Sequence, residues 1–242
     1  MCFGSSERKI VMTKVILREM LSKLKMWLAR QYIKFMIKSC AALVPQKEEK
    51  SNKRILIIRL DEIGDMVLTT PFLRELRRNF PKSEITLVVK PTTYNLFELC
   101  PYIDKLKSFK RASGRWEVFQ NLNLAKAFAH QELHDDYDLA IVPRFDSDFA
   151  YMAGAIAFYS GAARRVGYAP WALPHKSKTD AGMEGFYTDF VPVREGVCHE
   201  VERNLDVLRY LGCNIQSDAL ELWIDEHDKE TAIRLLSTGG ET

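Results

Sequence analysis

The stretch of sequence that decides the fold reads Arg54-Ile-Leu-Ile-Ile-Arg-Leu-Asp-Glu-Ile-Gly-Asp65. Residues 54–60 form a short apolar run with β-branched side chains, which predicts a buried parallel strand. The run ends in a loop with one glycine, Gly64, and a carboxylate, Asp65, at the start of a helical pattern over residues 65–80. We therefore expect Asp65 to lie where the first strand of a sheet meets its first helix.

Strands and helices alternate through the body of the chain. Further strands are predicted over residues 84–89, 105–109, 137–142 and 165–168, the last an edge strand, and helices over 92–99, 115–133, 148–159 and 199–211. This order predicts the α/β class, a Rossmann-like doubly wound parallel sheet whose ligands lie beyond the C-terminal ends of the strands. Residues 169–197, rich in Pro, Gly and charge, are expected to be irregular.

Composition and charge limit the possible classes of protein. The chain has 242 residues, 47% of them hydrophobic, which is enough to bury the core of one domain. Its five cysteines are scattered without a C-x-x-C pair, so we expect neither a disulfide framework nor a zinc site, and a reducing cytoplasm. Residues 1–53 hold 12 Lys and Arg against 4 Asp and Glu, and the remainder holds 23 against 28. Nucleic-acid binding is disfavoured because the body is net acidic and has no known module.

The N-terminal segment predicts an amphipathic helix over residues 15–44, followed by a polar linker. Its apolar stripe consists of Leu17, Met20, Leu21, Leu24, Trp27, Leu28 and Phe35. The residues predicted to contact an anionic membrane surface are Arg18, Lys23, Trp27, Arg30 and Lys34. Packing of the helix on its own domain stays open, because Met26, Ile33 and Ile37 lie off the stripe. Spanning is disfavoured, since it would bury three cations at about 2.5–3.5 kcal/mol each.

The loop at Asp65 lacks the motifs of several common enzymes. With one glycine it has no G-x-G-x-x-G, which makes a nicotinamide enzyme unlikely, and the chain has no phosphate loop, nucleophile elbow or H-E-x-x-H pair. A carboxylate at the mouth of a sheet suits a positioned base. The alternative is that Asp65 only satisfies free backbone N–H groups in the first turn of its helix.

The same stretch resembles the opening of family 9 glycosyltransferases, the family of the lipopolysaccharide heptosyltransferases. The shared pattern is an apolar strand, a polar pair, an apolar residue before Gly-Asp and two further apolar residues, and a proline inside the first helix, here Pro71. The resemblance continues at Asn79-Phe80-Pro81, Tyr137-Asp138-Leu139-Ala140-Ile141, Ala163-Arg164-Arg165-Val166-Gly167-Tyr168 and His199-Glu200-Val201-Glu202-Arg203-Asn204. It covers residues 53–212, with a weak tail to residue 224.

This resemblance implies the N-terminal half of a GT-B glycosyltransferase. It implies that Asp65 is the catalytic base, which takes the proton of an acceptor hydroxyl while that oxygen attacks the anomeric carbon of ADP-heptose with inversion. No metal ion and no cofactor are implied, since ADP-heptose is the donor substrate. The implied acceptor is a phosphorylated glycolipid such as the lipopolysaccharide core, met at the inner face of the cytoplasmic membrane.

The resemblance also implies a set of substrate-binding residues. These are Gly64, Lys110, Arg111, Arg115, Arg144, Arg165 and His199. The arginines and the lysine can equally be solvated cations or ordinary ion pairs. His199 can equally cap the helix that follows it.

The chain departs from the family after residue 212. The expected organisation is a basic helix and linker over 1–52, a Rossmann-like acceptor domain over 53–212, and an inter-domain segment with the truncated start of a donor domain over 213–242. Residues 224–242 are too few to build a nucleotide-binding unit, which needs more than about 30 residues. We therefore expect a truncated product, an isolated domain, or half of an enzyme completed by a separate donor-domain polypeptide, inactive alone.

Two other functions compete with the transferase. One is a non-catalytic module at the membrane surface that binds acidic glycolipid or protein through the basic helix and the Arg-lined domain. The other is a receiver-like phosphoacceptor domain, in which Asp61 and Glu62 would form the acidic pair. It is disfavoured because Val142-Pro143-Arg144 ends the later strand without the required Asp.

Overall fold

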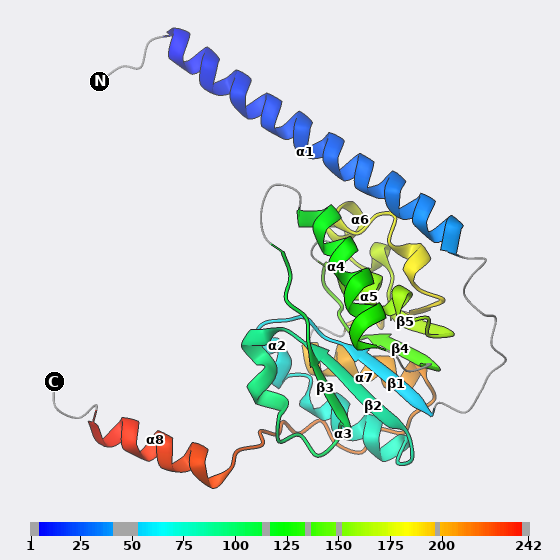
Figure 1. Cartoon of the computed structure of the whole chain (residues 1–242), viewed down its shortest axis with the longest axis vertical. Helices are drawn as coiled ribbons and strands as arrows, with labels where there is room; N and C mark the ends of the chain where they lie inside the picture. Colours follow the sequence, from blue (N-terminus) through cyan, green and yellow to red (C-terminus); the bar gives the residue numbers. More distant parts are fainter. Residues whose placement is uncertain are drawn as a thin grey trace.

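The body of the molecule is one six-stranded sheet with helices on both faces (Figure 1). The computed structural model describes residues 5–40, 53–112, 117–133, 137–148, 152–196 and 199–238. The strands are β1 (Arg54–Ile58), β2 (Glu84–Val89), β3 (Lys105–Ser108), β4 (Leu139–Val142), β5 (Arg164–Tyr168) and β6 (Asp189–Val191). They pair in the order β3-β2-β1-β4-β5-β6, and every pair is parallel. The predicted doubly wound sheet is confirmed, and its order reverses between β1 and β4, where such folds bind ligands.

Both faces of the sheet are buried, and β1 shows how its sequence achieves this. Successive side chains of a strand point to opposite faces, so Leu56 and Ile58 enter one core while Ile55 and Ile57 enter the other. The first core is covered by α4 (Glu117–Glu132) and α5 (Met152–Tyr159), the second by α3 (Thr70–Asn79) and α7 (Glu200–Tyr210). An uninterrupted apolar strand is therefore what this position in the sheet requires.

The first helix of the body differs from the prediction. The pattern over residues 65–80 forms two helices, α2 (Ile63–Val67) and α3, instead of one. Pro71 lies in the first turn of α3, where it needs no N–H partner, whereas inside a continuous helix it would break the hydrogen-bond ladder. Asp65 thus lies on a short helix of its own.

Two further segments differ from the prediction. The pattern over residues 92–99 forms a 3₁₀ helix, η1 (Pro91–Phe97). Residues 169–197 are not wholly irregular. They contain η3 (Pro170–Ala172), α6 (Lys176–Thr179), η4 (Glu184–Phe186) and β6. Because β6 pairs with β5, the predicted edge strand β5 lies inside the sheet. The sequence did not predict β6, since a strand of three residues is too short to show an alternating pattern.

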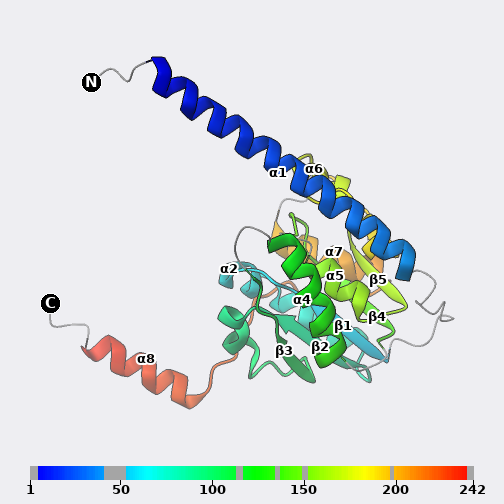
Figure 2. The same ribbon diagram turned by 45° about the horizontal axis from the view of Figure 1, so that its top comes forward.

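The helix α1 (Ser5–Cys40) packs on the body with its C-terminal part (Figures 1 and 2). Ala29 and Ile33 are fully buried there, and a Cβ atom at Gly185 would lie 2.6 Å from the Cδ1 atom of Ile37. The guanidinium of Arg30 donates a hydrogen bond of 2.5 Å to the carbonyl oxygen of Lys178. Packing on the domain, one of the alternatives for this helix, is therefore confirmed for its C-terminal end.

The predicted apolar stripe of α1 stays uncovered. Its members Leu17, Met20, Leu21, Leu24, Trp27, Leu28 and Phe35 are all exposed, from 41% for Leu21 to 68% for Phe35. At 3.6 residues per turn this stripe lies on the side of the helix opposite to Ala29, Ile33 and Ile37. Among the described residues, no helix is both long enough and apolar enough to cross a membrane.

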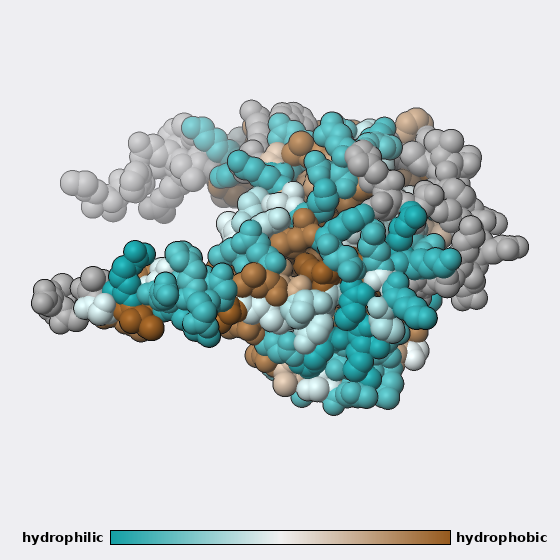
Figure 3. Space-filling model, turned by 60° about the horizontal axis from the view of Figure 1, so that its bottom comes forward, coloured by the Kyte–Doolittle hydropathy of each residue, from teal (hydrophilic) through white to brown (hydrophobic). Residues whose placement is uncertain are grey.

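The C-terminal segment runs along the body in extended form and ends in α8 (Glu226–Thr238), which projects away from it (Figures 1 and 3). Glu221 forms an ion pair with Arg74 and accepts a hydrogen bond of 2.8 Å from the hydroxyl of Tyr102. The ring of Trp223 packs against Phe97 and Tyr102. The alternate side chains Leu220, Leu222 and Ile224 are exposed, as are Ile233, Leu235 and Leu236 of α8.

Candidate active site

Asp65 is exposed at the edge of the sheet formed by the C-terminal ends of the strands. It lies in the first turn of α2, which is held down by the fully buried side chain of Met66. Beside it, a Cβ atom added to Gly64 would meet no atom within 4 Å, so the chain itself leaves this space open. The position is as expected from the sequence, and the role of Asp65 as a base stays a prediction.

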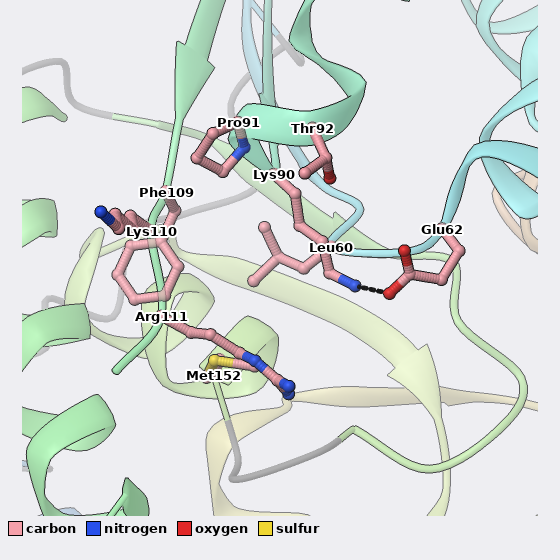
Figure 4. A pocket seen from close by; sticks show the side chains of 9 residues that line it. All are labelled: Leu60, Glu62, Lys90, Pro91, Thr92, Phe109, Lys110, Arg111 and Met152. Atoms are coloured by element: carbon pink, nitrogen blue, oxygen red, sulfur yellow. Dashed lines mark hydrogen bonds and ion pairs between the residues drawn. The ribbon is translucent and has the colours of Figure 1, made fainter. Parts of the chain in front are cut away.

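A pocket of about 370 Å³ opens at the same edge (Figure 4). Its lining comes from the loops that follow β1, β2 and β3 and from the start of α5. The lining residues are Leu60, Glu62, Lys90, Pro91, Thr92, Phe109, Lys110, Arg111 and Met152. Leu60 and Glu62 belong to the loop that leads into α2, so the wall of the pocket continues directly into the helix that carries Asp65. Its volume falls within the range of about 300–1,000 Å³ of small-molecule sites.

Cations supply much of the polar lining of this pocket. The ammonium of Lys90 forms an ion pair with the carboxylate of Glu62. The side chain of Arg111 reaches across the pocket toward the same end, whereas that of Lys110 points away from Glu62 (Figure 4). The structure thus brings two of the predicted substrate-binding residues, Lys110 and Arg111, to one pocket, and a third, Arg115, lies outside the described residues.

A buried ionic network lies beneath the loop of Asp65. Arg59, 1% exposed, forms ion pairs with Asp61 at 2.6 Å and with Glu200 of α7 at 2.7 Å. Its guanidinium also donates to the carbonyl oxygen of Pro143 at 2.7 Å and to the side chain of Asn204 at 3.3 Å. One side chain therefore ties the end of β1 to the loop after β4 and to α7.

Arg144 belongs to this network, although the sequence predicted it to bind substrate. Its guanidinium pairs with the buried carboxylate of Asp61 and donates a hydrogen bond of 2.5 Å to the carbonyl oxygen of Ser147. Burial lowers the pKa of the Arg144 guanidinium from its usual value. Arg144 lies at the correct edge of the sheet, but these contacts use its charge to hold the loops together.

The last two predicted substrate-binding residues serve the fold. Arg165 is the second residue of β5, at the opposite edge of the sheet from Asp65, and it is buried. Its guanidinium donates to the carbonyl oxygens of Phe186 and Ala162, both at 2.8 Å, which corrects the expectation for Arg165. His199 is the N-cap of α7, where its Nδ1 accepts a hydrogen bond of 3.3 Å from the backbone N–H of Val201. The alternative expectation for His199, that it caps the helix that follows, therefore agrees with the observed contact.

A second group of buried charges lies behind the loop after β4. Asp148 accepts hydrogen bonds from the backbone N–H groups of Gly154 and Ala153, and burial raises its pKa to about 6. The ammonium of Lys176 donates to the carbonyl oxygen of Phe145 at 3.1 Å. No group of three or more His, Cys, Asp or Glu side chains among the described residues is arranged to hold a metal ion.

Sequence reasoning did not single out Lys90, nor Glu62 as a residue of a pocket. Lys90 is the first residue after β2, and polar residues that follow parallel strands meet at one edge of the sheet. That rule was available from the sequence and would have indicated Lys90. Lys90 can pair with Glu62 because β1 and β2 are neighbours in the sheet, and the sequence alone does not fix which strands are neighbours.

The fold and this site define a class of protein. A parallel sheet in this order, with an exposed carboxylate and a cation-lined pocket at the C-terminal edge, is a Rossmann-like α/β domain with its ligand site in the usual place. No family model matches the chain.

Two curated proteins are similar to this chain in sequence. Over 52 residues, or 22% of the chain, it is 38% identical to a protein of Haemophilus influenzae named as a glycosyltransferase. Over 116 residues, or 48% of the chain, it is 27% identical to lipooligosaccharide heptosyltransferase 2 of Haemophilus ducreyi. These matches span 15% and 30% of the lengths of the two relatives.

Two solved structures share the fold. One is a family 9 glycosyl transferase from Veillonella parvula, with a TM-score of 0.60 and 23% identity, which matches 82% of this chain and 52% of that protein. The other is the ADP-heptose lipopolysaccharide heptosyltransferase II of E. coli, with a TM-score of 0.53 and 17% identity over 76% of this chain and 50% of that protein. The chain thus shares the fold of these two proteins and spans about half of their length.

Proposed function

We propose that this chain is the acceptor-binding half of an inverting glycosyltransferase that transfers heptose from ADP-heptose to a lipopolysaccharide core or a related glycolipid. The observation that carries the proposal is the exposed carboxylate of Asp65, on the short helix that directly follows the loop lining a cation-bearing pocket. The named activities of the sequence relatives support the same class of reaction.

In this proposal Asp65 acts as the general base. Its carboxylate takes the proton of an acceptor hydroxyl as that oxygen bonds to the anomeric carbon of the donor sugar. The bond from the anomeric carbon to the ADP oxygen breaks with its electron pair, so ADP leaves and the configuration inverts. A carboxylate is a weak base, but it suffices when the proton is lost late, after an oxocarbenium-like centre has formed. The step needs no metal ion and no cofactor.

The donor is bound elsewhere in this proposal. The described residues contain one sheet, and its pocket has cations for an acidic acceptor. We propose that ADP-heptose is bound by a donor domain that residues 1–242 do not form, and that these residues alone transfer no sugar. The test mixes the purified chain with the donor half of a heptosyltransferase, ADP-heptose and a phosphorylated glycolipid, and measures glycolipid product by mass spectrometry. Transfer by the chain alone, or no transfer by the mixture, would contradict this division.

Lys110 and Arg111 are proposed to bind the acidic acceptor. Arg111→Gln is expected to weaken binding of detergent-dispersed lipid A about tenfold, because a hydrogen bond to a charged group contributes about 1.5–3 kcal/mol. Lys110→Gln should weaken it less, since Lys110 points away from the polar end of the pocket (Figure 4). The measurement is calorimetric titration. Lys107→Gln is the control, because the Lys107 ammonium pairs with Glu132 at 2.9 Å away from the pocket, and an equal loss in this variant would refute the assignment.

The helix α1 is proposed to bind the chain to an anionic membrane surface, at the inner face of the cytoplasmic membrane. Its body-facing side is fixed by Ala29 and Ile33, while the opposite side presents the exposed stripe described above. Exposed Arg18, Lys23 and Lys34 can contact lipid phosphates. Arg30 is the exception among the predicted membrane residues, because its guanidinium bonds to Lys178 of the body.

Membrane binding is testable with one substitution on each side of α1. Leu24→Glu, in the stripe, is expected to weaken binding to vesicles containing phosphatidylglycerol at least about tenfold, since insertion of a leucine contributes about 1.5–3 kcal/mol. The matched control is Ser22→Glu, which adds the same charge on the side away from the stripe. Cosedimentation measures both, and equal losses in the two variants would show that charge alone, not the stripe, controls binding.

A second candidate function follows from the same helix. A non-catalytic module could use α1 and the pocket to hold an acidic glycolipid or a protein at the membrane surface. The exposed stripe of α1 favours this candidate as much as it favours the transferase. Only the transferase requires Asp65, so the mixing experiment separates the two.

A further inference from the structure

The polar end of the pocket is occupied by a carboxylate of the chain itself. Glu62 forms an ion pair with Lys90 and lies close enough to Arg111 for that charge to act on it. Glu62 is the N-cap residue of α2, yet its side chain makes no capping hydrogen bond. Short polar side chains such as aspartate are the ones that usually accept from the backbone N–H groups at this position. The carboxylate of Glu62 therefore pairs with Lys90 of the pocket and does not cap the helix.

The two partners of this ion pair are exposed to very different degrees. The Lys90 side chain is 21% exposed and the Glu62 side chain is 77% exposed. The cation is thus fixed in the wall, while the carboxylate covers it from the solvent side. The hydrogen bond and charge of Lys90, with a weaker effect of Arg111, lower the pKa of Glu62, so this group remains an anion at neutral pH. An exposed ion pair of this kind is weak enough for another anion to replace it.

Apart from Thr92 and Lys110, the rest of the pocket lining is apolar. Its apolar lining consists of Leu60, Pro91, Phe109 and Met152 (Figure 4). Phe109 is 3% exposed and its ring packs against Phe128, so this wall belongs to the core of the domain. A cavity with one apolar wall and two cations at one end fits a sugar ring that carries a single phosphate group.

We propose that Glu62 is a resident counter-ion of this pocket, and that a phosphate group on the bound sugar replaces it on Lys90 and Arg111. Lys90 is then a residue that determines specificity for phosphorylated ligands. The inference rests on the proposed function, because it refines how the acceptor pocket selects its ligand. It also predicts an unusual sign: removing a polar contact of the pocket strengthens binding.

The test compares four variants of the full chain. Glu62→Gln retains the shape of the side chain and removes its charge, and it is expected to bind phosphate about threefold to fivefold more tightly. Lys90→Gln is expected to bind at least about fivefold more weakly. The matched controls are Glu132→Gln and Lys107→Gln, which alter an exposed ion pair outside the pocket and should leave the affinity unchanged.

The probes are inorganic phosphate and detergent-dispersed lipid A, titrated by calorimetry at low and high salt. Tighter binding of both probes to Glu62→Gln supports the inference for phosphate in general, and tighter binding of lipid A alone supports it for a lipid-linked phosphate. The gain should shrink at high salt. If the unaltered chain binds lipid A but Glu62→Gln binds no more tightly, the inference fails and the acceptor proposal stands. If the unaltered chain binds neither probe, both fail.

Discussion

Asp65→Asn is expected to lower heptosyl transfer by about 10²–10⁴-fold when the chain is combined with a donor-domain polypeptide. Removal of a general base typically costs this much, because asparagine cannot accept the proton of the attacking hydroxyl. Asp65 is exposed and its side chain makes no hydrogen bond or ion pair with the described residues, so asparagine should leave the fold intact. The measurement is the initial rate of glycolipid product formation at saturating substrates.

The control for this prediction is Asp218→Asn, which removes a second exposed carboxylate far along the chain from the pocket. Its rate should equal that of the unaltered chain. Binding of lipid A to Asp65→Asn should change little, because the proposed role of Asp65 appears in the rate and not in the affinity. An Asp65→Asn variant that transfers sugar at the full rate would remove Asp65 from the mechanism and favour the non-catalytic module.

Most of the fold could be predicted from apolar runs. The strand at residues 54–58 is apolar on both faces because helices cover both sides of the sheet, and the same holds for β2 and β4. The prediction failed where a strand was too short to show an alternating pattern, or where a proline interrupted a helical pattern. Three residues of β6 show no alternation, and Pro71 separates α2 from α3 although the apolar spacing continues across the break.

The candidate site was only partly predictable. Glycine, aspartate and the end of a strand located Asp65, and the cations after β3 located one wall of the pocket. The positions of Arg144 and Arg165 were misleading, because a sequence does not show whether a guanidinium faces solvent or the carbonyl oxygens of its own chain. Arg165 is the second residue of β5 instead of following the strand, and this alone places it at the wrong edge of the sheet.

The helix α1 shows how two interpretations can both describe one element. Membrane-surface binding was predicted from the apolar stripe, and packing on the domain from the apolar residues outside that stripe. The structure assigns these residues to opposite sides of one helix, with Ile33 buried and Phe35 exposed. Packing is established for one side, and lipid binding stays a proposal for the other.

Arg59→Met is expected to destabilise the chain by about 3–5 kcal/mol. Methionine retains much of the volume but removes a buried cation, and breaking a buried ion pair costs this much because the partner charge is left unpaired. Asp61 is 3% exposed and would keep Arg144 as its only ion-pair partner among the described contacts. The carbonyl oxygen of Pro143 and the carboxylate of Glu200 would lose their contacts with Arg59 as well. Urea unfolding followed by circular dichroism measures the change.

The control for this expected loss of stability is Arg194→Met. Arg194 also forms two ion pairs, with Glu202 and Asp206, but its side chain is 48% exposed. Its loss should cost less than about 1 kcal/mol, because water replaces the missing partner. Equal destabilisation by the two variants would mean that burial does not increase the contribution of the Arg59 ion pairs to stability. A large difference would mean that buried charges hold the segment leading into α2, the helix that carries Asp65. Arg59 and Arg144 could then not leave Asp61 to bind substrate without unfolding the candidate site.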